Sequence, residues 1–364
     1  MLPKLFSKKF LGIDIGTFSL KLVELAEAGE NFSLSNYGQY DIEPNQNLGM
    51  VDSERKIMAS FSAQEIAEII QAIMSEAKMK TRQCAFSIPD FSTFFTTFSL
   101  PAMTKKELSD AVIFEARQHI PLPIDSVTVD WQLIGGEFGK SDKMEIAMTA
   151  IPNEVIAKYR DIAAKAGLQL ALIEAEAFGL AQALISKEEL RPVCLIDIGI
   201  QSTVCSLMEN QVLRYSHSFD RGADYLFKAL IRQLPISREI IQSIEKSCGL
   251  QAFSFIEPDI KNNMRNIFRD SFLPILKEIE MALAEYRRSS GIEIAKIILS
   301  GGAAALPEVM DQFKNYFQKE TEIADPFAKI NYPKEMQEEI KKIGPAYAVA
   351  VGMARRGFNL MNKK

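Results

Sequence analysis

A short pattern that occurs twice constrains the fold more than any other feature of the chain. The first copy reads Leu-Gly-Ile-Asp-Ile-Gly-Thr over residues 11–17, and the second reads Leu-Ile-Asp-Ile-Gly over residues 195–199. Each is an apolar strand that ends in an aspartate, followed by a glycine, small hydroxyl residues and a second apolar run. Such a hairpin exposes backbone N–H groups that can bind phosphate, and its aspartate can orient a hydrated divalent cation. Two copies in separate halves of the chain predict a nucleotide held between two related domains.

Composition and charge exclude several classes of protein. The 364 residues are enough for two or more cores, and 42 Lys and Arg against 47 Asp and Glu give a net charge of −5, so no general basic field favours nucleic acid. No apolar run approaches the roughly 20 residues that span a bilayer. The four cysteines form no CxxC pair and the chain has two histidines, so we expect neither a zinc site nor a His-based triad, and a reduced cytosolic compartment fits. Lysines and apolar residues alternate over residues 1–10, which leaves a weak membrane contact and a solvated tail both open.

Hydrophobic periodicity and capping signals predict the order of elements in the first half. A strand at about 32–42 follows the first hairpin, and we expect a helix at 62–79 and strands at 84–88 and 94–100 to complete one mixed sheet. Residues 102–167 then predict a small inserted unit of helix, strand, strand and helix, whose first helix runs from a Thr104–Glu107 capping box to His119. A strand at 168–174 and a helix at 177–185 would return the chain to the first sheet.

The second half is predicted to repeat this plan. It begins with a strand at 193–198 and the second hairpin, and it contains a long helix whose first turn holds Pro274. An apolar strand at 294–299 then runs into Ser300-Gly301-Gly302, and a helix at about 345–356 closes the chain. Two glycines between a strand and a helix allow the backbone to approach a purine or its α-phosphate closely.

Small residues and one lysine in the first hairpin are suited to phosphate. Gly16, Thr17 and Ser19 could supply hydrogen-bond donors without bulky side chains, and Lys21 on the return strand could add a positive charge. The alternative for either hairpin taken alone is a tight β-turn that requires glycine.

The order of these elements resembles the actin-like ATPase superfamily, which includes actin, heat-shock chaperone ATPases, sugar kinases and the cell-division protein FtsA. Within it the chain is similar to the PilM family of type IV pilus assembly proteins. The resemblance spans nearly the whole chain and is carried by GIDIGTFSLKLVEL, by residues 99–135 of the insertion, and by SGGAAALPEV with PAYAVAVGMARRGF near the end. In the insertion, a helix followed by His-Ile-Pro-Leu-Pro and a Val-x-Trp strand resembles the SHS2-type subdomain of PilM and FtsA.

The resemblance implies an α/β fold of two actin-like domains, which are duplicated ribonuclease H-like units, with an inserted SHS2-type α+β subdomain. The first domain (1A) would comprise residues 10–101, completed by 168–190 and 345–356. The insertion (1C) would comprise residues 102–167. The second domain (2A) would comprise residues 191–344, with 2B at about 220–292.

The resemblance also implies ATP with Mg²⁺ as the ligand. Its phosphates would be faced by Asp14, Gly16, Thr17, Ser19 and Lys21 from the first domain and by Asp197, Gly199 and Thr203 from the second. Gly301 and Gly302 would flank the adenosine, and Asp14 and Asp197 would hold Mg²⁺ through water. Glu176 matches an acidic position that orients the attacking water in relatives; the alternative is a helix-terminal glutamate that complements the helix dipole.

Three departures from the superfamily pattern weaken the expectation of catalysis. Phe18 places a bulky ring in the first turn, Ile200-Gln201 makes the second loop poor in glycine, and residues 240–246 lack the Ala-Glu pair expected to hold the ribose. We therefore expect ATP to bind but its hydrolysis to be weak or absent.

The implied role is that of a cytoplasmic scaffold at the inner membrane, peripheral to it through its partners. It would bind the N-terminal cytoplasmic tail of a PilN-like bitopic protein between the first domain and the insertion, with the helix 104–119 and the adjoining strands as the wall. Other pilus platform proteins and self-association are further implied contacts. Two alternatives stay open. One is an FtsA-like division polymer, although only residues 357–364 follow the last expected helix. The other is a small-molecule kinase, with Asp90 or Asp130 as its base.

Overall fold

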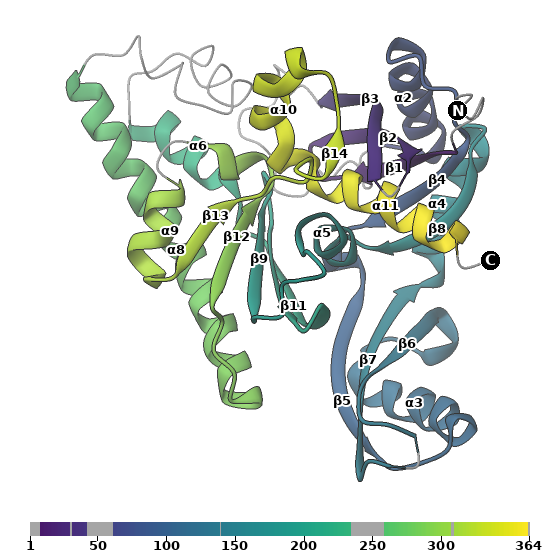
Figure 1. Cartoon of the computed structure of the whole chain (residues 1–364). Coiled ribbons are helices and arrows are strands. Elements are labelled where there is room, and N and C mark those ends of the chain that lie inside the picture. Colours follow the sequence, from purple (N-terminus) through teal and green to yellow (C-terminus); the bar gives the residue numbers. More distant parts are fainter. Residues whose placement is uncertain are drawn as a thin grey trace.

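The computed structural model describes residues 8–29, 31–41, 61–138, 140–233, 258–306 and 309–362. Residues 1–7 of the basic N-terminus, and residues 240–246 of the expected ribose helix, lie outside this part of the chain. Two large sheets lie side by side, and a smaller sheet extends from one end of the molecule (Figure 1).

The first sheet is built from the N-terminal hairpin. Its strand order is β14-β3-β2-β1-β4-β8, in which β1, β2 and β3 form an antiparallel meander while β4 and then β8 add in parallel. The strands are β1 (Lys9–Ile15), β2 (Ser19–Ala28), β3 (Asn31–Asp41), β4 (Gln83–Ile88), β8 (Gln169–Ala175) and the short β14 (Ile330–Asn331). The predicted return of the chain to this sheet through β8 is confirmed.

The second sheet repeats the first in order and direction. It runs β11-β10-β9-β12-β13, again with an antiparallel meander followed by two parallel strands. The strands are β9 (Val193–Ile198), β10 (Thr203–Glu209), β11 (Val212–Phe219), β12 (Lys296–Ser300) and β13 (Glu320–Ile323). The duplication predicted from two short hairpins therefore extends to whole sheets.

Helices cover both faces of each large sheet. Helices α2 (Ala63–Glu76) and α4 (Asn153–Lys165) cover the outer face of the first sheet. Helices α6 (Ala223–Gln233), α8 (Pro258–Ser290) and α9 (Val309–Phe317) pack on the second. Between the sheets lie α5 (Glu176–Leu184) and α11 (Ala348–Asn362), whose apolar residues share one core with both (Figure 1).

The remaining short elements connect these layers. They are α10 (Gln337–Ile343) and the 3₁₀ turns η1 (Asp90–Ser92), η2 (Ile124–Ser126), η4 (Gly302–Ala305), η5 (Lys334–Met336) and η6 (Gly344–Tyr347). Among the described residues, the structure contains no helix with the length and apolar character of a membrane span.

The long helix differs from the sequence prediction, because Pro274 lies inside α8 and not in its first turn. A proline within a helix removes one backbone hydrogen bond and typically costs about 3 kcal/mol. The helix continues because Phe272, Ile275 and Leu276 around the proline are almost fully buried in the core of the second half. Tertiary packing thus overrides the local helix-breaking signal.

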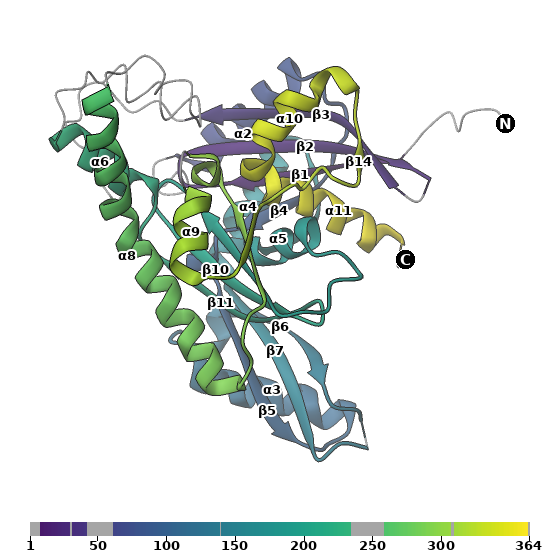
Figure 2. The same cartoon turned by 60° about the vertical axis from the view of Figure 1, so that its left-hand side comes forward.

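The small sheet has its own core and begins earlier than the predicted insertion. Strands β5 (Phe94–Pro101), β6 (Val127–Gly135) and β7 (Lys143–Pro152) form it in the order β5-β7-β6, and α3 (Lys105–His119) packs on it (Figure 2). β5 was expected in the first sheet, but alternate residues Phe94, Phe98 and Leu100 face the core under α3. Conversely, α4 was expected in the insertion, but its Tyr159 and Ile162 pack under the first sheet. The division of the chain into domains stays a prediction.

Candidate nucleotide site and adjoining groove

The two predicted hairpins close with the same hydrogen bond. The Gly16 N–H donates to the Ser19 carbonyl at 3.0 Å, and the Gly199 N–H donates to the Ser202 carbonyl at 2.9 Å. A Cβ added at Gly16 would lie 3.1 Å from the Ser19 carbonyl oxygen, and one added at Gly199 would lie 3.0 Å from the Ser202 carbonyl oxygen. Both distances are shorter than an ordinary contact. Both glycines thus have the same tight surroundings, and the two turns, called the paired turns below, are structural copies.

Each of the paired turns is preceded by an aspartate that a serine on the neighbouring parallel strand holds. Ser87 Oγ at the end of β4 donates to Oδ1 of Asp14 at 2.7 Å. Ser300 Oγ at the end of β12 donates to Oδ1 of Asp197 at 2.8 Å. Sequence reasoning missed Ser87 and gave Ser300 no role. The signal was a serine at the end of the strand next to each Asp strand, but strand adjacency is not visible in one sequence.

Lys21 is a cation whose charge acts on both Asp14 and Asp197. It is directly opposite Asp14 in the β1–β2 register, is 9% exposed, and its ammonium group donates to Ser19 Oγ. Burial raises the pKa of Asp14, while the positive charge of Lys21 and the Ser87 hydrogen bond lower it in part. An ammonium group has three donors, so Lys21 keeps donors for a further anionic ligand.

The structure brings Asp197 and Glu176 into the same electrostatic environment as Asp14. Burial raises the pKa of Asp197 to about 6, and the negative charge of Asp14 contributes to the rise. Burial also raises the pKa of Glu176 well above its usual range, and the negative charges of Asp90, Asp197 and Asp14 raise it further. Mutual repulsion of this kind is relieved when a cation binds. In the described chain, no three His, Cys, Asp or Glu side chains are grouped as direct ligands of a metal ion.

Gln201, beside the second turn, has a buried side-chain amide that forms no hydrogen bond within the described chain. The residue is 6% exposed, and its side-chain oxygen and nitrogen are buried without a hydrogen-bond partner. An unsatisfied buried amide costs about 1–3 kcal/mol, so such groups are normally paired with protein, water or ligand. Sequence reasoning treated Gln201 only as a departure from a glycine-rich loop. Its orphaned amide fits a polar ligand such as a phosphate.

The two glycines after β12 have different surroundings. Gly301 has φ +88°, and a Cβ there would lie 2.4 Å from the Ile198 carbonyl oxygen. Gly302 begins η4, and nothing lies within 4 Å of a Cβ built on it. Gly301 is therefore a requirement of the fold, whereas Gly302 borders open space that a ligand could occupy.

The remaining predicted residues differ in how available they are. Thr17 and Ser19 are half-buried in the first turn. Thr203 is fully buried, and its hydroxyl donates to the Arg221 carbonyl at 2.7 Å. That hydroxyl is engaged within the second half, and this geometry does not favour a phosphate contact for it. Phe18, in the same turn, is also half-buried.

Glu176 begins α5 as predicted, and Asp90 holds its side chain. The Asp90 N–H donates to Glu176 Oε1 at 3.0 Å, and Asp90 Oδ1 accepts the Ala177 N–H at 3.3 Å. Ser216 Oγ donates to the other carboxylate oxygen of Asp90. Both carboxylate oxygens of Asp90 therefore accept hydrogen bonds from within the chain. Asp130 is exposed on β6 and accepts from the following backbone N–H, away from the paired turns.

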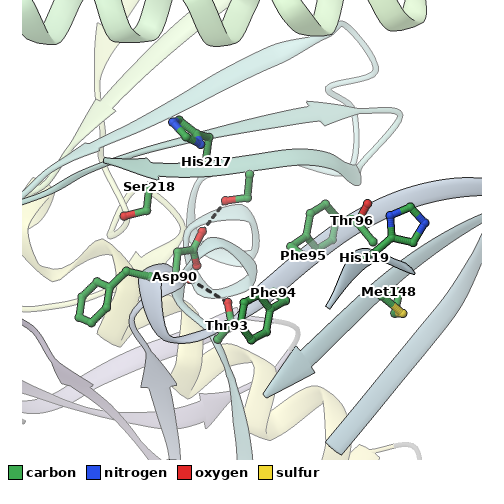
Figure 3. A pocket seen from close by; sticks show the side chains of 11 residues that line it. Asp90, Thr93, Phe94, Phe95, Thr96, His119, Met148, His217 and Ser218 are labelled. Carbon is green, nitrogen blue, oxygen red and sulfur yellow. Dashed lines mark hydrogen bonds between the residues drawn. The ribbon is translucent and has the colours of Figure 1, made fainter. Parts of the chain in front are cut away.

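A groove with a cavity volume of about 250 Å³ adjoins Asp90 (Figure 3). Its walls are residues 90, 91 and 93–96, His119 at the end of α3, Met148 of β7, and residues 216–218 of β11. Both histidines of the chain line it. His119 stacks on Phe98 with ring centroids 5.3 Å apart and ring planes 8° apart. Of the predicted wall, α3 supplies His119, and the adjoining strands β5 and β7 supply residues 94–96 and Met148. β11 of the second half forms a further wall that the sequence did not indicate.

Comparison with known proteins agrees with this architecture. The family model of the type IV pilus assembly protein PilM matches residues 12–358. The cell division protein FtsA of Bacillus subtilis (strain 168) is 22% identical over 346 residues, which cover 87% of this chain and 78% of FtsA. A solved PilM–PilN type IV pilus biogenesis complex matches with a TM-score of 0.78 and 21% identity, covering 95% of this chain and 98% of that one. MreB 5 of Spiroplasma citri bound to AMPPNP matches with a TM-score of 0.53 and 14% identity, covering 99% of this chain and 100% of that one. The predicted actin-like two-domain fold is thereby confirmed.

Proposed function

Because the chain belongs to the PilM family of type IV pilus assembly proteins, we propose that it is an ATP-binding scaffold of the pilus assembly platform. It would work at the cytoplasmic face of the inner membrane and bind the N-terminal cytoplasmic tail of a PilN-like bitopic protein. Other platform proteins and further copies of this chain are additional partners in the proposal. The observation that carries the nucleotide part is the pair of copied turns with their serine-held aspartates.

The paired turns would hold the triphosphate from both sides. Gly16 and Gly199 keep the turns tight, Lys21 supplies positive charge, and the orphaned amide of Gln201 supplies a donor and an acceptor. Asp14 and Asp197 would hold a hydrated Mg²⁺ ion, which when bound supplies the charge that offsets the buried carboxylates. MreB 5 bound to AMPPNP supports this reading, because a relative in fold binds a nucleotide analogue.

We expect this chain to hydrolyse ATP slowly. In the absence of a bound cation, burial and the neighbouring carboxylates raise the pKa of Glu176 well above its usual range, which favours its protonated form. A protonated carboxyl group cannot accept a proton from an attacking water. Phe18 is a half-buried residue of the first turn, and a bulky side chain at this position would hinder the approach of phosphate. ATP would therefore act as a structural or switching ligand.

Isothermal titration of Mg·ATP into the full chain tests the nucleotide proposal. We expect measurable binding to the wild type and weaker binding to Asp197→Ala, which loses the carboxylate beside the second turn. Asp142→Asn is a matched control, because Asp142 is exposed on the insertion and its loss should leave binding unchanged. Absence of binding heat for the wild type would contradict the proposal.

The groove is the proposed site for the tail. It lies where the insertion meets η1 and β11, and it combines apolar walls such as Phe94 and Phe95 with polar groups from Asp90 and two histidines (Figure 3). A solved complex of PilM with PilN that covers 95% of this chain supports a PilN-like partner.

Fluorescence anisotropy with a labelled synthetic peptide of the tail tests the partner proposal. His119→Ala should weaken binding, because His119 lines the groove and stacks on Phe98. Gln118→Ala, exposed on the same helix and outside the groove lining, should leave it unchanged. Equal binding by both variants would place the tail elsewhere.

The similarity to FtsA supports polymerisation as a second candidate function. Sedimentation of the full chain with and without Mg·ATP tests it. Pelleting that depends on nucleotide would favour a filament, and its absence would favour a scaffold that does not polymerise.

A further inference from the structure

Asp90 lies between the paired turns and the groove, and it makes contacts toward both. It follows β4 in η1, is 9% exposed and lines the groove (Figure 3). Its N–H donates to Oε1 of Glu176 at 3.0 Å, and its Oδ1 accepts the N–H of Ala177 at 3.3 Å. This one residue therefore fixes the first turn of α5, and with it the glutamate that shares the electrostatic environment of the paired turns.

The second carboxylate oxygen of Asp90 contacts the other half of the molecule. Ser216 Oγ donates to it from β11, the edge strand of the second sheet. Nearby, Thr97 Oγ1 on β5 donates to the Arg214 carbonyl at 3.3 Å, and the Arg214 guanidinium pairs with Glu145 of β7 at 2.8 Å. The walls of the groove thus come from both halves. Part of the groove wall therefore depends on the second sheet lying against η1 and the insertion.

A ligand at the paired turns also requires the two halves of the molecule to lie against each other. One turn joins β1 to β2 and the other joins β9 to β10, so a ligand held by both fixes the position of one half relative to the other. A ligand in the groove and a ligand at the turns therefore both favour the arrangement in which Ser216 reaches Asp90. Two ligands that favour one arrangement share its free-energy cost, and each strengthens the binding of the other.

We propose that Asp90, through its hydrogen bond from Ser216, is the positioning residue that couples the paired turns to the groove. The inference rests on the proposed function, because it needs a nucleotide at the turns and a tail in the groove. The tail strengthens the binding of Mg·ATP, and Mg·ATP strengthens the binding of the tail by the same factor, as thermodynamic linkage requires.

A thermodynamic cycle measured by titration calorimetry tests the coupling. It uses the full chain, Mg·ATP, and a synthetic peptide of the cytoplasmic tail of the PilN-like protein from the same genome. In the wild type, saturating peptide should tighten Mg·ATP binding about fivefold or more, and the reverse experiment should give the same factor. In Ser216→Ala, Mg·ATP alone should bind within about twofold of its wild-type affinity. Because Ser216 lines the groove, the tail alone is allowed to bind more weakly, and the measured quantity is the coupling factor, which should fall toward one.

Two further variants separate the Asp90 contact from other effects at Ser216. Ser206 Oγ lies 3.2 Å from Ser216 Oγ, so Ser206→Ala removes that serine pair but leaves Ser216 to donate to Asp90. It should keep the wild-type coupling, and Ser216→Thr, which retains a hydroxyl, should restore it. Independent binding of the two ligands to the wild type, or full coupling in Ser216→Ala, overturns the inference. Failure of either ligand to bind the wild type contradicts the proposed function itself, and the inference falls with it.

Discussion

Replacing Asp197 by asparagine should stabilise the ligand-free protein at neutral and basic pH while weakening its response to nucleotide. Burial, with a contribution from the charge of Asp14, raises the pKa of Asp197 from 3.8 to about 6. Asparagine has nearly the same shape, and its side-chain oxygen can still accept the hydrogen bond that Ser300 donates at 2.8 Å. The substitution therefore removes a charge whose burial is unfavourable and keeps the local geometry.

The size and sign of the effect follow from proton linkage. The folded protein binds the Asp197 proton more tightly than the unfolded chain does. The contribution of this proton to the free energy of unfolding is fully present below about pH 4. It is lost as the pH rises toward 6 and is absent above pH 6. A rise of this size corresponds to about 3 kcal/mol at most, and partial solvent access to the side chain reduces it to about 1–3 kcal/mol. Asp197→Asn should gain this amount at about pH 8 and almost nothing at about pH 4.

Urea unfolding of the ligand-free protein, followed by circular dichroism across this pH range, measures the first effect. A thermal-shift titration with Mg·ATP measures the second, because a ligand that binds only the folded state raises the melting temperature. Wild type should gain stability from Mg·ATP, and Asp197→Asn should gain less. Asp142→Asn, at an exposed position, serves as the control. The reasoning is refuted if Asp197→Asn has the pH dependence of the wild type or is less stable than the wild type at about pH 8.

Three further substitutions test the packing around the site. Gly301→Ala should lower the free energy of unfolding by more than about 1 kcal/mol, because φ is +88° and the Cβ would lie 2.4 Å from a β9 carbonyl oxygen. Gly302→Ala should keep the stability of the wild type but weaken Mg·ATP binding. Urea unfolding and calorimetry compare the two variants, and equal stability would contradict the assignment. Gly352→Ala should lower the free energy of unfolding by about 1–3 kcal/mol, because its Cβ would lie 1.8 Å from an α5 carbonyl oxygen where α5 crosses α11. An unchanged midpoint of urea unfolding would show that these helices can separate. Arg356→Ala removes a bidentate pair with Glu174 and a cation–π contact between α11 and α5, so it should lower the free energy of unfolding by about 1–2 kcal/mol. Arg356→Lys should recover only part of this stability in urea unfolding. Full recovery by lysine would show that the bidentate geometry does not matter.

The elements that sequence reasoning predicted well are those whose signals are local. The hairpins around Asp14 and Asp197, the capping box at Thr104 and the start of α5 at Glu176 all lie where the pattern indicated. Alternation of apolar residues and short-range capping bonds decide such elements within a few residues, so one sequence contains the information.

The misplaced elements are those that depend on a partner far away in the chain. β5 reads as a plain strand, and only its pairing with β7 assigns it to the small sheet. Pro274 reads as a helix start, and only the core around it allows α8 to continue past it. Sheet partners and core packing are long-range choices, and local propensity is a weak guide to them.

The sequence by itself determined that two copies of one strand–Asp–turn–strand unit exist, because turn chemistry and strand period are properties of a few consecutive residues. Only the tertiary structure decided what those copies do together. It placed Ser87 and Ser300 on the two aspartates, left the amide of Gln201 buried without a partner, and joined Asp90 to Ser216 across the two halves. In each case the groups that meet come from segments far apart in the sequence. These contacts form only when both sheets have folded and lie against each other.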